Sequence, residues 1–165
     1  MLRSSLLLCV ALCASWPTAA QGLITKKAMS IEMAETIAHT AIAQCRTMNF
    51  HVSVSVIDAS GLLQAFLRDE PTGPHTIELS RKKAFTALTF ANRWDSSGEA
   101  AKAWHSTLGS PMPNVEGTVG VAGGVPIKAG NEVIGAVGVS GAVGGANDEI
   151  CARAGIAKVA SELKP

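Results

Sequence analysis

Apolar residues between positions 31 and 46 recur with the spacing of an α-helix. Ser30 is placed to cap the start of that helix, and Glu32 would stabilise its first turn. The apolar positions fall on one stripe, which consists of Ala34, Ile37, Ala38, Ala41, Ile42 and Cys45. A stripe of this kind predicts a helix with one face against a core, so we expect Cys45 to be buried.

Apolar and polar side chains alternate from residue 51 to residue 68, which is the period of a β-strand. The first half puts its valines on one face and its serines on the other: Val52, Val54 and Val56 against Ser53 and Ser55. Asp58 to Gly61 has the composition of a tight turn, so residues 62–68 would return as the second strand of a hairpin. On this second strand Phe66 and Arg68 share one face.

Proline and glycine interrupt the pattern after the hairpin, and helical spacing then resumes. A helix is predicted from about Thr76 to about Arg93. Ser96 and Glu99 are three residues apart and form a capping box for a shorter helix that ends near Trp104.

Glycine and valine dominate the last third of the chain. Residues 123–127 and 132–140 are predicted strands, and Asn147 is expected to cap a last helix that runs through Leu163. The resulting order, α-β-β-α-α-β-β-α, contains hairpins and no βαβ crossover. We therefore expect an α+β fold of two layers, in which helices flank a mainly antiparallel sheet.

The first twenty residues follow a different pattern, that of a secretory signal. Arg3 supplies a positive charge, residues 4–14 form an apolar run too short to span a bilayer, and Thr18-Ala19-Ala20 offers small residues for cleavage. We expect cleavage after Ala20, which leaves residues 21–165 as a single periplasmic or secreted domain with no membrane span. The alternative is a retained N-terminal membrane anchor.

Removal of that segment changes both the charge and the cysteine content. The chain has 14 basic and 13 acidic residues, and the loss of Arg3 would leave 13 of each. This balance gives no electrostatic reason to expect nucleic acid as a partner. Cys45 and Cys151 would be the cysteines that remain, and in an oxidising compartment they are candidates for a disulfide. The alternative is two free thiols whose Cα atoms lie more than about 7 Å apart.

His75 is the histidine with the most suggestive surroundings. It follows Gly73 and Pro74 at the start of a predicted helix, and Glu78 and Lys82 would share its face. An imidazole near basic side chains can ligate haem iron while the cations pair with the haem propionates. The alternative, which spacing alone favours, is a histidine that caps the helix beside a solvated run of charges.

Five segments occur in order along the chain: residues 54–61 (VSVIDASG), 81–87 (RKKAFTA), 123–127 (GGVPI), 135–141 (GAVGVSG) and Asp148-Glu149. Together they resemble the GlcG/HbpS family of haem-binding or haem-degrading domains, which also form the C-terminal part of PduO-type corrinoid proteins. The resemblance implies a profilin-like sandwich, formation of homo-oligomers, and binding of haem or a related tetrapyrrole. The chain departs from the family at residues 68–73, where RDEPTG replaces a segment of the Arg-Met-Asp-Gly-Ala type, on the side where the resemblance implies the ligand.

The first hypothesis is therefore an exported small-ligand-binding protein that binds haem or a related tetrapyrrole as a scavenger, carrier or sensor accessory. The porphyrin would lie against Phe66, with His75 facing the iron and with Arg68 or Lys82 paired to carboxylates. No residue is assigned a catalytic role in this hypothesis.

Two other functions remain open. One is an enzyme or accessory subunit that acts on a small organic acid or a corrinoid, with Arg68 binding a carboxylate and Asp58 or Glu78 acting as a base. Asp58 is explained more simply as a turn residue. The other is an oligomerisation module with no ligand of its own.

Overall fold

The computed structural model describes residues 22–108 and 115–164. The predicted signal peptide, its cleavage site and the fate of that segment lie outside the described residues. In the described part of the chain the elements follow the order expected from the sequence. They are α1 (Ile31–Thr47), β1 (Ser53–Asp58), β2 (Leu63–Arg68), α2 (His75–Phe90), α3 (Ser97–Leu108), β3 (Gly124–Ala129), β4 (Glu132–Ser140) and α4 (Gly145–Lys158).

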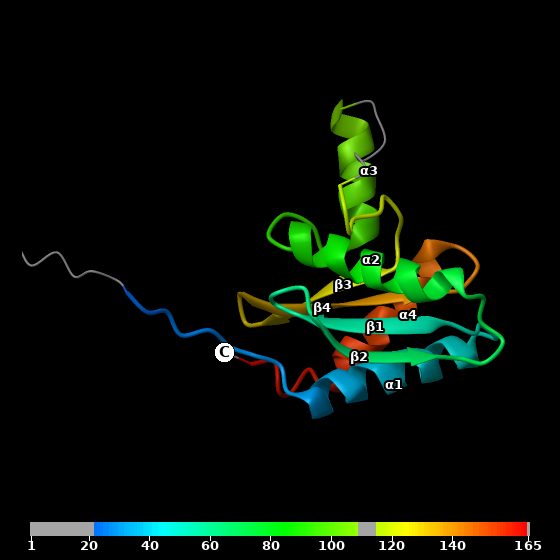
Figure 1. The fold of residues 1–165 in the computed structure, drawn as a ribbon, viewed down its shortest axis with the longest axis horizontal. Coiled ribbons are helices and arrows are strands. Elements are labelled where there is room, and N and C mark those ends of the chain that lie inside the picture. Colours follow the sequence, from blue (N-terminus) through cyan, green and yellow to red (C-terminus); the bar gives the residue numbers. More distant parts are fainter. Residues whose placement is uncertain (1–21, 109–114, 165) are drawn as a thin grey trace, which may run out of the picture.

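The strands form one antiparallel sheet in the order β2-β1-β4-β3. Helices α1 and α4 cover one face of this sheet, α2 lies across the other, and α3 projects away from α2 (Figure 1). The predicted α+β class with an antiparallel sheet is confirmed. None of the helices in the described ranges is both long enough and apolar enough to span a membrane.

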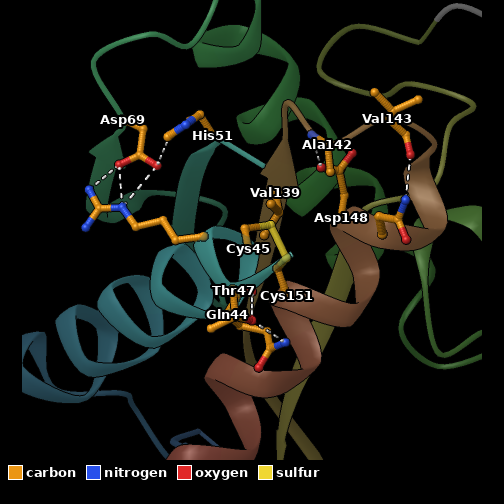
Figure 2. Close-up of a disulfide and its surroundings, with 12 residues drawn as sticks. Gln44, Cys45, Thr47, His51, Asp69, Val139, Ala142, Val143, Asp148 and Cys151 are labelled. Carbon is orange, nitrogen blue, oxygen red and sulfur yellow. Dashed lines mark hydrogen bonds and ion pairs between the residues drawn. A yellow bond between two sulfur atoms is a disulfide. The ribbon is translucent and has the colours of Figure 1, made fainter. Parts of the chain in front are cut away.

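The face under α1 and α4 carries the main apolar core. Val52, Val54 and Val56 point to this side, as the alternation predicted, and they pack with the buried stripe of α1. Cys45 of α1 and Cys151 of α4 form a disulfide with their Cα atoms 5.4 Å apart (Figure 2). The predicted disulfide is therefore confirmed, and the alternative of two distant thiols is wrong.

The face under α2 combines hydroxyl pairs with a small apolar cluster around Ile57 and Ala84, and the helix lies very close to the sheet. Ser53 is hydrogen-bonded to Thr76 at 2.7 Å, and Ser55 to Ser80 at 2.8 Å. Gly138 of β4 lies directly beneath the helix, where a Cβ would come within 2.0 Å of the carbonyl oxygen of Ser80. Glycine at this position lets the backbones of α2 and β4 touch.

Both boundaries of helix α4 differ from the expected ones. Helix α4 begins at Gly145, because Gly144 takes a φ of +83° that glycine adopts readily and turns the chain into the helix earlier. Asn147 therefore lies inside the first turn, where its side chain donates to the carbonyl of Val143. Helix α4 ends at Lys158 rather than Leu163.

Helices α2 and α3 start where they were expected and end elsewhere. Helix α2 stops at Phe90, about three residues early, and α3 continues past Trp104 to Leu108. The predicted cap of α3 is present, since the Ser96 hydroxyl accepts a hydrogen bond from the Glu99 amide at 3.1 Å.

Candidate functional site

A pocket of about 460 Å³ opens where α2 begins, β4 ends and α4 begins. We call it the His75 pocket. It is lined by His75, Leu79, Lys83, Val121, Ala122, Ser140, Gly141, Ala142, Gly145 and Asp148. Small and apolar side chains make up most of its wall, and a few polar groups converge on it, which is the usual composition of a small-ligand site.

A buried ion pair forms the inner side of the His75 pocket. The Lys83 ammonium lies 2.6 Å from Oδ2 of Asp148, and their side chains are 4% and 2% exposed. Lys83 also donates to the carbonyl of Val139, and Oδ1 of Asp148 accepts from the Ala142 amide at 3.0 Å. Burial raises the pKa of the Asp148 carboxyl, while the charge of Lys83 and its hydrogen bond act in the opposite direction. The pair ties α2 to the end of β4 and the start of α4.

The pairing of Lys83 with Asp148 was not predicted from the sequence. Lys83 stood in a basic run and Asp148 in the first turn of a helix, 65 residues apart. A signal was nevertheless present, because Lys83 falls on the same helical stripe as Thr76, Ser80 and Ala84. A lysine on a buried stripe requires a partner.

His75 is the first residue of α2, and its side chain is exposed at the mouth of the pocket. The ring folds back over Gly73, where a Cβ would lie 2.9 Å from Cε1 of the imidazole. The N-cap of α2 is Pro74, with no side-chain capping bond. A histidine that caps the helix is therefore not what the structure contains.

Glu78 and Lys82 lie together on a different part of α2. The Glu78 carboxylate is 3.1 Å from Arg81 and 3.9 Å from Lys82. The hydrogen bond from Arg81 lowers the pKa of Glu78 below its usual value, against the effect of burial. With Glu116 and Gly117 these side chains line a second pocket, which we call the Glu78 pocket. Glu78 and Lys82 are thus near His75 along the helix but do not line its pocket.

Phe66 and Arg68 also lie outside the lining of the His75 pocket. Phe66 is half-buried on β2, opposite Ser55. The Arg68 guanidinium donates to the carbonyls of Glu70 and Thr72, at 3.2 and 2.8 Å. Arg68 therefore braces the loop that leads to His75.

A second polar cluster lies beside the end of α1. The Asp69 carboxylate, 1% exposed, accepts hydrogen bonds from Arg46 and lies 3.3 Å from Nδ1 of His51 (Figure 2). Burial alone would raise the pKa of Asp69, but the hydrogen bonds and charges of Arg46 and His51 outweigh it and leave the pKa below its usual value. No partner for His51 was visible in the sequence, because Asp69 is 18 residues away.

Asp58 serves the turn between β1 and β2. Its carboxylate accepts from the amides of Ser60 and Leu62, at 2.8 and 2.9 Å. Across the described ranges no group of three or more His, Cys, Asp or Glu side chains is placed to hold a metal ion.

A four-stranded antiparallel sheet between helical layers, with a pocket at one end, defines a class of small α+β domains. The family model described as haem degrading protein HbpS-like matches residues 29–157. The chain therefore belongs to the HbpS-like family. This confirms the resemblance seen in the sequence.

Similar proteins agree with this assignment. A double mutant of HbpS from Streptomyces reticuli is 33% identical, with a TM-score of 0.75 over 87% of this chain and 97% of that one. A Citrobacter freundii protein, named an uncharacterized 15.0 kDa protein in the dhaT-dhaS intergenic region, is 28% identical over 68% of this chain and 80% of its own length. The structure of a PduOC:heme complex is 23% identical, with a TM-score of 0.69 over 80% of this chain and 95% of that one, and this likeness concerns the fold.

Proposed function

We propose that this protein binds haem or a related tetrapyrrole at the His75 pocket. The observation that carries the proposal is the exposed imidazole of His75 at the mouth of a pocket lined mainly by small and apolar residues, in a chain that belongs to the HbpS-like family of haem-degrading proteins. Haem supplies an iron with axial positions that accept imidazole nitrogen. The haem complex of PduOC, which shares the fold, supports the same ligand class.

The residues of the pocket fit a porphyrin edge. The volume of about 460 Å³ lies within the range of about 300–1,000 Å³ common for small-ligand sites. Val121 lines the pocket and is partly exposed, and Val143, next to Ala142, is 79% exposed. Exposed apolar side chains beside a pocket favour an apolar ligand that covers them.

Neither cation lines the His75 pocket, but Lys82 is freer than Arg68 to pair with a haem propionate that extends beyond it. The guanidinium of Arg68 is occupied by two loop carbonyls. The Lys82 ammonium is partly exposed and is held only loosely by Glu78, at 3.9 Å. An exposed ammonium can exchange such a contact for a ligand carboxylate at little cost.

The same proposal places the protein outside the cytoplasm, as a haem scavenger, carrier or sensor accessory that forms homo-oligomers. The signal-like pattern of residues 1–20 and the Cys45–Cys151 disulfide support export to an oxidising compartment. N-terminal sequencing of the protein recovered from cells is expected to begin at Gln21. A sequence that begins at Met1 would contradict export by cleavage, and a monomer at all concentrations in sedimentation would contradict oligomer formation.

The test of binding is a hemin titration followed by absorbance in the Soret region. Wild-type protein is expected to give a saturable change, and His75→Ala a different spectrum and weaker binding. His39→Ala, which removes an exposed histidine of α1, is the matched control and should behave as wild type. No saturable change in wild type would refute haem binding. A wild-type spectrum in His75→Ala would refute only the iron contact.

The alternative of an enzyme acting on an organic acid or a corrinoid requires Arg68 close to Asp58 or Glu78. Arg68 is bound to the 69–74 loop, Asp58 holds a turn, and Glu78 lies in the Glu78 pocket. Haem binding is therefore the function that the geometry supports best.

A further inference from the structure

Lys83 has an unused hydrogen-bond donor at the inner side of the His75 pocket. A lysine ammonium carries three N–H donors. One points to the carbonyl of Val139 and one to Asp148. The third is left for whatever enters the pocket that Lys83 lines.

Ser140 offers a second polar group in the same place. It is the last residue of β4, is 2% exposed and lines the pocket. The serines beside it on β1 are paired, Ser53 with Thr76 and Ser55 with Ser80. The Ser140 hydroxyl takes part in none of the side-chain hydrogen bonds found among the described residues. A hydroxyl that lines the pocket without a protein partner is available to a ligand there.

The start of α4 adds a third element. Gly144, its N-cap, provides no side-chain capping bond, and Gly145 lines the pocket. A Cβ on Gly145 would lie 2.7 Å from the carbonyl oxygen of Ala122, so the helix start forms part of the pocket wall. The amides of an uncapped helix N-terminus favour a negatively charged group.

We propose, building on haem binding, that Lys83, Ser140 and the first turn of α4 form a carboxylate site that takes one propionate of the tetrapyrrole. Asp148 already balances the charge of Lys83, so the site recognises the carboxylate through directed donors rather than through excess charge. A carboxylate has two oxygens that each accept hydrogen bonds. An ester of the same shape carries no charge and accepts more weakly.

The experiment compares hemin with hemin dimethyl ester on three proteins: wild type, Ser140→Ala and Ser55→Ala. Ser55→Ala is the matched control, because it removes a buried serine on the same face of the sheet that is paired with Ser80. Wild type is expected to bind hemin about tenfold more tightly than the ester, since a hydrogen bond to a charged group is of that order. Ser140→Ala should lose about that factor for hemin and several-fold less for the ester, with the Soret maximum of bound hemin unchanged.

Several results would overturn the carboxylate site. Equal affinity of wild type for hemin and ester would do so while leaving haem binding intact. Equal losses for both ligands in Ser140→Ala, or no loss for hemin, would place the propionate elsewhere. A loss for hemin in Ser55→Ala that matches the loss in Ser140→Ala would assign the effect to general damage of this face. Absence of hemin binding by wild type would remove the proposed function and this inference together.

Discussion

The two faces of the sheet are held by different kinds of contact. Under α1 and α4, valines of the strands meet the apolar stripe of α1, and the Cys45–Cys151 disulfide links the two helices. Under α2, paired hydroxyl groups, a glycine backbone in contact with the helix and the Lys83–Asp148 ion pair accompany a smaller apolar cluster around Ile57 and Ala84. The same four strands thus carry the larger aliphatic core on one side and mixed polar and apolar contacts on the other.

The two faces therefore contribute to the fold in different ways. Apolar burial is non-directional and grows with the area removed from water. Hydrogen bonds and buried ion pairs require fixed partners and lose their value when a partner moves. The α1 and α4 side therefore supplies cohesion, whereas the α2 side holds one helix in one register. The His75 pocket lies at the first turn of α2, so its shape depends on where these contacts hold the helix.

The largest expected effect comes from breaking the Lys83–Asp148 ion pair on the α2 face. Lys83→Met would leave the Asp148 carboxylate buried without its cation, which costs about 3–5 kcal/mol of unfolding free energy. Lys82→Met, one residue earlier and on the partly exposed side of α2, should change stability by less than about 0.5 kcal/mol. Urea unfolding of both variants checks this. Equal losses would show that burial of Lys83 does not matter.

The close approach of α2 to β4 can be tested with one methyl group. In Gly138→Ala the new Cβ would meet the Ser80 carbonyl oxygen at 2.0 Å and the Ala84 nitrogen at 2.5 Å, both of them backbone atoms. We expect a loss of about 3 kcal/mol, at the upper end of overpacking effects. Gly22→Ala, where a Cβ meets nothing within 4 Å, is the control. Wild-type stability in Gly138→Ala would contradict the contact.

Reduction of the disulfide weakens the other face. Loss of the Cys45–Cys151 bond should lower the unfolding free energy by about 2–4 kcal/mol, because it releases a long loop in the unfolded chain. Urea unfolding with and without reductant measures this, and Cys45→Ala/Cys151→Ala should not respond to reductant. If the two faces act separately, the folded reduced protein keeps its hemin affinity. A parallel loss of affinity would mean that the faces are coupled.

The smallest effect concerns a single hydroxyl pair. Ser55→Ala should cost about 1 kcal/mol, since Ser80 keeps its bond to the carbonyl of Ile77 at 2.9 Å. Ser55→Ala/Ser80→Ala should cost little more, because no buried donor is left without a partner. A double-mutant cycle in urea measures the coupling. Strict additivity would show that the two hydroxyls do not interact.

The helices and strands could be predicted from the sequence, because each one depends on the spacing of apolar residues that are close together in the chain. The stripe ending at Cys45 and the valine alternation of β1 both appear in the structure as expected. The start of α4 was misplaced for a local reason as well. Asn147 has the side chain of a typical cap, but the positive φ of Gly144 starts the helix first.

The interacting residue pairs of the site were harder to predict from the sequence, because their members are far apart in the chain. His75 could be singled out from its place at the start of a helix. Lys83 could be assigned to a buried stripe, but no local pattern tells which of many carboxylates pairs with it. The partner of His51 is similarly hidden, since Asp69 comes into reach only when β2 lies beside β1.

The disulfide has a topological consequence. Cys45 and Cys151 are 106 residues apart, so their bond closes a covalent ring that contains the whole sheet together with α2 and α3. One peptide-bond cleavage anywhere inside this ring opens it without separating the two pieces. A protease that nicks a loop there yields a molecule of unchanged mass on a non-reducing gel, with its strands still tethered to their neighbours.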